Sequence, residues 1–270
     1  MRIATWAWRE QCRLIMGRGE EVSPRGQLTR ELRASTVRVD MQYPLVVCPA
    51  RRLNYSFAAA EALWILDGDD RVAPLAMHNP NIAQFSDNGI IFAGAYGPPI
   101  MAQLDYVLAC LRNDRDTRQA VLTIWQRCPP KSKDVPCTVA MAFSIRRDAL
   151  NCAVFMRSSD VFLGLPYDIF NFSLVAALVA CMYNVDRVDP VELGELTITA
   201  ASSHAYERDW VRIRECLADA SAENCRQLPQ ACIRVGAWPS IYDSLVACRD
   251  KHDSQRTQAW IIRPGIEECI

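Results

Sequence analysis

The sequence predicts an α+β fold, from three observations. Asn54 precedes apolar residues at helical spacing that end at Gly68, which indicates a capped helix. Three strand-like runs then follow between residues 119 and 156. The stretch from Asp168 to Tyr183 is almost wholly apolar, but about 16 residues are short for a bilayer of roughly 30 Å. We therefore expect a helix in the protein core there, beside a sheet.

The elements predicted along the chain form a single domain over residues 1–270, because no repeat or Gly/Ser linker interrupts it. Polar stretches at 18–30 and 128–136 are predicted loops. We expect helices at 54–68, 101–111, 168–183 and 207–217, and strands at 119–125, 138–145, 151–156 and 191–200.

Composition and charge narrow the possible ligands. With 270 residues, 50% of them hydrophobic, the chain can bury one large core. A net charge of -1 and a pI near 6.3 give no overall field that would hold a nucleic acid polymer. We expect a small anionic ligand, met by individually placed arginines.

The N-terminus and the cysteines indicate a reducing compartment. Charged residues at Arg2, Arg9, Glu10 and Arg13 argue against a secretory signal or a membrane span, so we expect a cytoplasmic protein without a membrane partner. The twelve cysteines include no CxxC pair, and the three histidines are far apart in sequence. We therefore expect reduced thiols and no metal site.

Two motifs carry the most information: VPCT at 135–138, and FMRSSDVFLGLPYDIFNF at 155–172. They resemble the thymidylate synthase family, which has a nucleophilic cysteine after a proline and then the pattern QRSxDvFLGlPFNI. Arg25 in a polar loop and the motifs EALWIL, GAYG and DTRQ match further family motifs in the same order. The resemblance covers nearly the whole chain. It implies a thymidylate synthase-like domain, with a mixed central sheet packed by helices and a homodimer joined sheet to sheet.

The resemblance also implies the catalytic residues. Cys137 would attack C6 of a pyrimidine nucleoside monophosphate, so that C5 could accept a one-carbon unit from the co-substrate 5,10-methylenetetrahydrofolate. A free thiol is a poor nucleophile until a cation stabilises the thiolate, and Arg157 is the candidate cation. Glu61 would manage protons through ordered water, and Tyr96 would lie near the C5 proton.

Binding residues follow from the same resemblance. Arg25, Arg157 and Ser158 would bind the phosphate, together with Arg118 donated by the partner subunit across the dimer interface. The family has a second arginine where this chain has Gln119, so Lys131 or Lys133 could supply that contact instead. The remaining implied contacts are a folate contact from Asp160 and sugar contacts from His204 and Tyr206.

Asp168 departs from the family pattern in an informative way. The methylating enzymes have asparagine here, whose amide both donates to and accepts from the edge of uracil. A carboxylate only accepts, which suits the amino group of cytosine and a protonated N3. Aspartate at this position is the family mark of cytidylate hydroxymethylases, so we expect dCMP or CMP as substrate.

Other departures favour hydroxymethylation. Thr138 and Met156 replace a histidine and a glutamine of the family, and Ile82 and Phe85 occur where tryptophans are expected near the folate. A changed wall of the folate site would admit a water molecule. This water would add to the exocyclic methylene group that forms on C5 during the transfer. A thymidylate-type methylase acting on dUMP or dCMP, and a non-catalytic nucleotide-binding protein, remain as alternatives. The sugar is left open, and the C-terminal residues 266–270 are expected to close over the folate.

Overall fold

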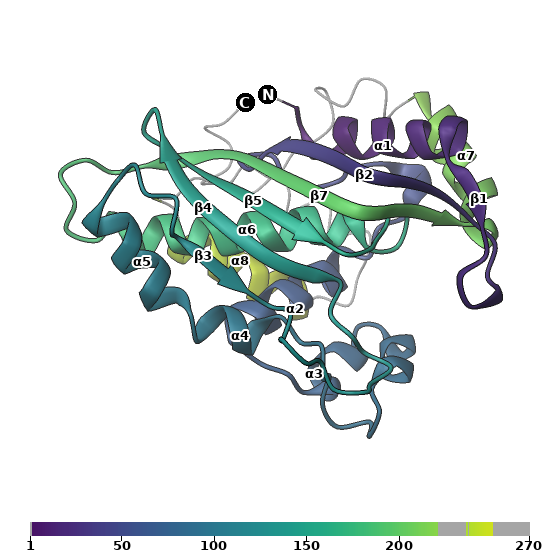
Figure 1. Cartoon of the computed structure of the whole chain (residues 1–270), viewed down its shortest axis with the longest axis horizontal. Helices are drawn as coiled ribbons and strands as arrows, with labels where there is room; N and C mark the ends of the chain where they lie inside the picture. Colours follow the sequence, from purple (N-terminus) through teal and green to yellow (C-terminus); the bar gives the residue numbers. More distant parts are fainter. Residues whose placement is uncertain (1, 221–235, 237, 251–270) are drawn as a thin grey trace.

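A seven-stranded mixed sheet organises the part of the chain that the computed structural model describes, residues 2–220, 236 and 238–250 (Figure 1). The strand order is β1-β2-β7-β5-β4-β3, and the short β6 pairs with β7. The strands are β1 (Glu20–Val22), β2 (Thr29–Asp40), β3 (Val121–Thr123), β4 (Thr138–Arg146), β5 (Ala149–Met156), β6 (Ser159–Asp160) and β7 (Glu192–Tyr206).

Strand directions show why the sheet is mixed. β4 and β5 form an antiparallel hairpin, whose turn residues Arg147 and Asp148 both have positive φ angles. β7 pairs in parallel with β5 and antiparallel with β2. A parallel pair needs a crossover connection, and a long helix between β6 and β7 supplies it. The mixed sheet expected from the sequence is therefore present.

Helices cover one face of this sheet. Figure 1 shows α6 running along the sheet, with α2, α5 and α8 near it. The helices are α1 (Ala4–Arg18), α2 (Tyr55–Leu66), α3 (Val72–Ala76), α4 (Gly97–Met101), α5 (Leu104–Asn113), α6 (Leu165–Asn184), α7 (Trp210–Ala218) and α8 (Trp238–Asp250), with 3-10 turns at Pro24–Gly26, Pro49–Arg51, Pro80–Phe85 and Glu207–Asp209.

The apolar stretch around residues 168–183 is the core helix α6. Within the described residues it is the one helix long and apolar enough to cross a bilayer, but most of it is buried inside the protein. Phe172, Ala176 and Val179 are at most 1% exposed. Its apolar composition is that of a helix surrounded by protein on all sides.

The two faces of the sheet differ in burial. Along β5, Leu150, Cys152 and Val154 are buried against the helices, whereas Ala153 and Phe155 on the opposite face are exposed. Phe155 keeps 46% of its surface accessible, which is high for a phenylalanine in a central strand. Among the described elements, the outer face of the sheet is therefore left partly open.

Several sequence predictions are confirmed, and others need correction. Asn54 caps α2 as expected, since its Oδ1 accepts from Phe57 N at 3.0 Å. The helix expected at 101–111 is interrupted at Ala102–Gln103 and divided between α4 and α5. The strand expected to end at 200 continues to Tyr206, and the helix expected at 207–217 begins as a 3-10 turn. The loop expected at 18–30 instead contains β1 and the first residues of β2, and α1 and α8 have no counterpart among the predicted elements.

Candidate active site

A cavity of about 230 Å³ lies where α2, α6 and the loop before β4 meet. Glu61 comes from α2, Asp168 and Asn171 from α6, and Cys137 from the position directly before β4. Tyr96 lines the same cavity just before α4. The structure thus brings together all three predicted catalytic residues and the predicted base-binding residue, although they span more than a hundred positions of the sequence.

Arg157 holds the loop that carries Cys137. Its backbone N donates to Cys137 O at 2.8 Å, its Nε to Pro136 O at 2.9 Å, and its Nη2 to Val135 O at 2.7 Å. Because these bonds occupy consecutive carbonyl groups, the guanidinium fixes the backbone next to the nucleophile. Arg157 is exposed and lies outside the lining of the cavity.

The thiol of Cys137 is protonated in the free protein. Burial raises its pKa, Arg157 lowers it, and the carboxyl groups of Asp168, Asp134 and Asp160 raise it further. The effect of Arg157 has the direction expected from the sequence, but burial outweighs it. Formation of the thiolate therefore has to be coupled to a change in the cavity, such as ligand binding.

Glu61 is a carboxyl group with a neutral-range pKa. Burial raises its pKa to about 7, while a hydrogen bond from Asn171 Nδ2 to Glu61 Oε2 at 2.7 Å acts in the opposite direction. A carboxyl group with such a pKa can both take up and release a proton near neutral pH. Its environment suits the acid-base role expected of it.

Asp168 lies in the first turn of α6. Burial raises its pKa well above the usual value, and the nearby Glu61 and Asp160 add to the increase. Burial therefore favours the neutral form of Asp168, which has one donor and one acceptor. The sequence predicted a side chain that only accepts hydrogen bonds. Because a neutral carboxyl group also donates, the base that binds it needs both an acceptor and a donor.

Tyr96 is fixed by packing and by one hydrogen bond. Its ring stacks on Phe172 of α6 with centroids 6.2 Å apart, and its Oη accepts from Thr138 N at 3.3 Å. Burial raises its pKa well above 10, and Asp168 and Cys137 contribute in the same direction. The phenol is thus a neutral hydroxyl held next to the nucleophile.

Asp160, His204 and Tyr206 form a second group, at the end of β7. Parallel pairing of β6 with β7 places Asp160 opposite His204. Asp160 Oδ1 accepts from the backbone N of Phe162 and Leu163 at 2.8 and 3.0 Å, so it also stabilises the turn before α6. The rings of His204 and Tyr206 meet edge to face at 5.0 Å, and burial lowers the pKa of His204.

The predicted phosphate ligands are dispersed over the described chain. Arg25 is exposed in the loop between β1 and β2 at a φ of 54°, and Ser158 lies between β5 and β6. Arg118 is exposed between α5 and β3. Within the described residues, the side chains of Arg25 and Arg118 form no hydrogen bond or salt bridge. Lys131 and Lys133 are also exposed.

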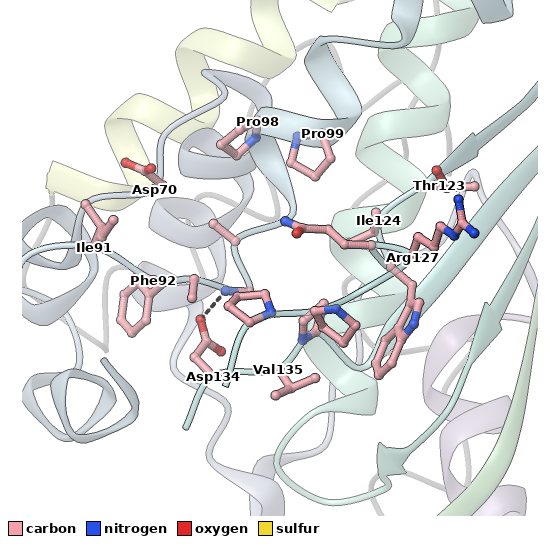
Figure 2. Close-up of a pocket in the computed structure, with 18 residues that line it drawn as sticks. Asp70, Ile91, Phe92, Pro98, Pro99, Thr123, Ile124, Arg127, Asp134 and Val135 are labelled. Atoms are coloured by element: carbon pink, nitrogen blue, oxygen red, sulfur yellow. Dashed lines mark hydrogen bonds between the residues drawn. The ribbon is translucent and has the colours of Figure 1, made fainter. Parts of the chain in front are cut away.

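A larger cavity of about 460 Å³ adjoins the nucleophile loop (Figure 2). Its apolar wall includes Phe92, Pro98 and Ile124, and it shares the segment Asp134–Pro136 with the cavity that contains Cys137. Gly94 N donates to Asp134 Oδ2 at 2.7 Å, and a Cβ on Gly94 would lie 2.8 Å from Asp134 O. The absence of a side chain at Gly94 thus lets the two walls approach each other.

Asn171 is a site residue that the sequence analysis missed. It is 4% exposed, lines the cavity and contacts Glu61. An amide within an otherwise apolar helix was the available signal, because buried polar side chains need a partner. Metal ligation has no support from the described residues, which contain no cluster of three or more histidine, cysteine or acidic side chains suited to an ion. The expected closing segment at 266–270 lies outside the described residues.

Comparison with known proteins identifies the family. Residues 6–243 match the thymidylate synthase family, so the chain belongs to it. The chain is also similar to a deoxyuridylate hydroxymethyltransferase of Bacillus phage SP01, with 29% identity over 219 residues. The match covers 73% of this chain and 55% of that protein, so the chain spans about half the length of this relative.

Proposed function

We propose that this protein is a pyrimidine nucleotide 5-hydroxymethyltransferase that uses 5,10-methylenetetrahydrofolate and prefers a cytosine nucleotide, dCMP or CMP. The observation that carries the proposal is the shared cavity of Cys137, Glu61 and Asp168. Membership of the thymidylate synthase family and the similarity to a phage hydroxymethyltransferase support the type of reaction. That relative is named for deoxyuridylate, so the preference for cytosine rests on Asp168 alone.

The proposed chemistry starts with the thiol of Cys137. Its Sγ adds to C6 of the ring once the proton has left, and C5 then becomes a carbon nucleophile. Glu61 accepts and returns protons near this position, which its pKa of about 7 allows. The neutral hydroxyl of Tyr96 lies beside Cys137, where the C5 proton is to be removed.

Asp168 would select the base through its proton. A neutral carboxyl donates to N3 of cytosine and accepts from the 4-amino group, and the proton can move to the basic N3 to give a charge-assisted pair. Uracil has an N3–H and a carbonyl at C4, so it can pair with the neutral carboxyl group but cannot take up its proton. Only cytosine can form the charge-assisted pair with Asp168.

The folate is proposed to bind at the apolar part of the same cavity. Ile82 and the half-exposed Phe85 belong to its lining, and an apolar wall suits the flat rings of a folate. Asp160 is the proposed polar contact to the pterin ring. Bound there, the folate supplies a one-carbon unit at the oxidation level of formaldehyde.

Phosphate binding is proposed to need a second copy of the chain. Arg25, Arg157 and Ser158 come from one subunit, and Arg118 from the other. The partly open outer face of the sheet, with Phe155 exposed on it, is the surface proposed to join the two copies. His204 and Tyr206 are the proposed contacts to a sugar hydroxyl group.

The deciding experiment incubates the purified protein with 5,10-methylenetetrahydrofolate and each of dCMP, CMP and dUMP. Product mass identifies the modification, and absorbance reports dihydrofolate. We expect a hydroxymethyl group on a cytosine nucleotide and no dihydrofolate. In Asp168→Asn, the amide fits uracil instead, so the ratio of kcat/KM for cytosine to that for uracil should fall by at least about 100-fold.

Two other outcomes would replace the proposal. A methylated product together with dihydrofolate would make the protein a methylase, acting on whichever nucleotide reacts. Tritium release from C5 of each labelled nucleotide separates an enzyme from a binding protein. If no nucleotide exchanges tritium or is modified, the protein is a non-catalytic nucleotide-binding member of the family.

A further inference from the structure

The amide of Asn171 is only half satisfied. Its Nδ2 donates to Glu61 Oε2 at 2.7 Å, while its buried Oδ1 has no hydrogen-bond partner in the described part of the chain. The residue is 4% exposed and lines the cavity that contains Cys137 and Asp168. A buried carbonyl oxygen without a partner costs free energy, so the site favours a ligand that brings a donor to it.

The orientation of this amide is set by its neighbour. An ionised Glu61 can only accept hydrogen bonds, so the amino end of Asn171 has to face it, and the oxygen then points away from Glu61. Asn171 follows Asp168 by three positions on α6, so both side chains lie on the same side of the helix. The fixed acceptor Oδ1 therefore stands next to the carboxyl group that is proposed to read the base.

We propose that Oδ1 of Asn171 accepts a hydrogen bond from the 4-amino group of the cytosine ring, which makes Asn171 a second base-selecting residue. This inference rests on the proposed function, because it requires a pyrimidine nucleotide in the cavity. The 4-amino group has two hydrogens: one, on the N3 side, goes to Asp168. The other, on the C5 side, points toward the region of Glu61 and is taken by Asn171.

Uracil cannot satisfy this arrangement. Its carbonyl group at C4 would face Oδ1 of Asn171, so two acceptors would meet and neither would have a donor. While Glu61 is ionised, Asn171 cannot turn its amino end toward the base without losing the hydrogen bond to Glu61. A site whose buried polar groups are left unpaired by the wrong substrate discriminates strongly against it.

The test measures binding rather than turnover. Cys137→Ser is used as the background, because it cannot form the covalent adduct, and calorimetry gives the Kd values of dCMP, dUMP, CMP and UMP without folate. Asn171→Leu, which keeps the size but removes both polar groups, should lower the preference for cytosine over uracil by about tenfold or more. Most of the change should come from weaker binding of the cytosine nucleotides. Asn171→Ser repeats the test with a smaller change if the leucine variant fails to fold.

Asn184→Leu is the matched control on the same helix. Asn184 is paired at both ends with Val191, at 2.9 and 2.8 Å, and it does not line the cavity. Its loss should lower stability and leave the cytosine preference unchanged.

Three results would overturn the inference. If both bases bind more weakly by the same factor, Asn171 only positions Glu61. If binding is unchanged, but Asn171→Leu with the native Cys137 gives less hydroxymethyl product when folate is supplied, Asn171 holds a water molecule instead of the base. If the Cys137→Ser protein binds none of the four nucleotides, the proposed function fails together with the inference.

Discussion

At the scale of single residues, the site is a group of buried side chains whose neutral forms are favoured by burial. Burial raises the pKa of Glu61, Asp168 and Cys137, and the two carboxyl groups oppose each other's ionisation. The side chains of such a site carry little charge until a bound ligand contributes hydrogen-bond donors or a basic group. Under the proposed function, binding of a nucleotide with a basic ring nitrogen would be the event that activates the nucleophile.

Glu61 should make the protein less stable as the pH rises. Its pKa is about 7 in the folded state, against 4.5 ordinarily, so the folded state holds the proton more tightly than the unfolded state does. Between these two values the free energy of unfolding falls with pH, by up to about 3.5 kcal/mol in total at about 1.4 kcal/mol per pKa unit. Glu61→Gln, which stays neutral and can still accept from Asn171, should remove this loss.

Urea denaturation at pH 4 and pH 8 tests this expectation. Glu61→Gln and the native protein should be similarly stable at pH 4, and the variant should be the more stable at pH 8. Glu215→Gln, an exposed position on α7, serves as the control and should change neither value. Equal stability of Glu61→Gln and the native protein at pH 8 would mean that Glu61 is hydrated and titrates in the usual range.

Sequence motifs predicted which side chains share the candidate site better than they predicted the chemical state of those side chains. Cys137, Glu61, Tyr96 and Asp168 were expected together, and they do share a cavity. Their pKa shifts could not be predicted, because burial depends on contacts between distant segments. Asn171 was missed for the same reason: its importance comes from Glu61, which is 110 positions away.

At the scale of elements, the register of β5 against β7 depends on one close approach. A Cβ on Gly194 would lie 2.4 Å from Asn151 Oδ1, which already accepts from Glu195 N at 2.9 Å. Asn151 Nδ2 also donates to Ala149 O at 3.1 Å, so the amide cannot move away without losing these bonds. The absence of a side chain at Gly194 in β7 thus allows the side-chain amide of Asn151 in β5 to bind the backbone of the neighbouring strand.

Gly194→Ala should therefore destabilise the protein by about 1–3 kcal/mol, because the added methyl group forces the strands apart or displaces the amide. Gly17→Ala in α1 is the matched control, since a Cβ there meets nothing within 4 Å. It should raise stability by about 0.5–1 kcal/mol, because alanine favours the helix. Thermal and urea unfolding of both variants give the two values. A neutral Gly194→Ala would show that the strand pair accommodates the methyl group by a small shift.

Elements with a strong local pattern were predicted, and those without one were missed. The capped helix α2 and the apolar helix α6 were clear from the sequence. In β2, by contrast, the sequence TRELRASTVRVD is mostly polar, and only Val37, Val39 and a few others are buried. Its strand conformation comes from pairing with β7 along its length, a long-range interaction that no local pattern reveals.

At the scale of the whole molecule, the outer face of the sheet and the position of Arg118 suggest the same assembly. The exposed Phe155 and Ala153 leave apolar surface on a central strand, which a second copy would cover. Arg118 is exposed, with no side-chain partner among the described residues, which is compatible with a phosphate ligand donated to another subunit. The dimer and the shared site are therefore one proposal, and both parts can be tested together.

Mixing two inactive variants tests this shared site. Cys137→Ala removes the nucleophile of its own site, and Arg118→Glu should repel the phosphate in the site of the partner. In a mixed dimer, one site then combines the native Cys137 of one chain with the native Arg118 of the other, and the second site carries both defects. Random reassociation of equal amounts should restore about a quarter of the native activity, because half of the dimers are mixed and each has one intact site. No recovery in a mixture that sedimentation shows to be dimeric would mean that Arg118 serves the site of its own chain, and a monomer would exclude the shared site altogether.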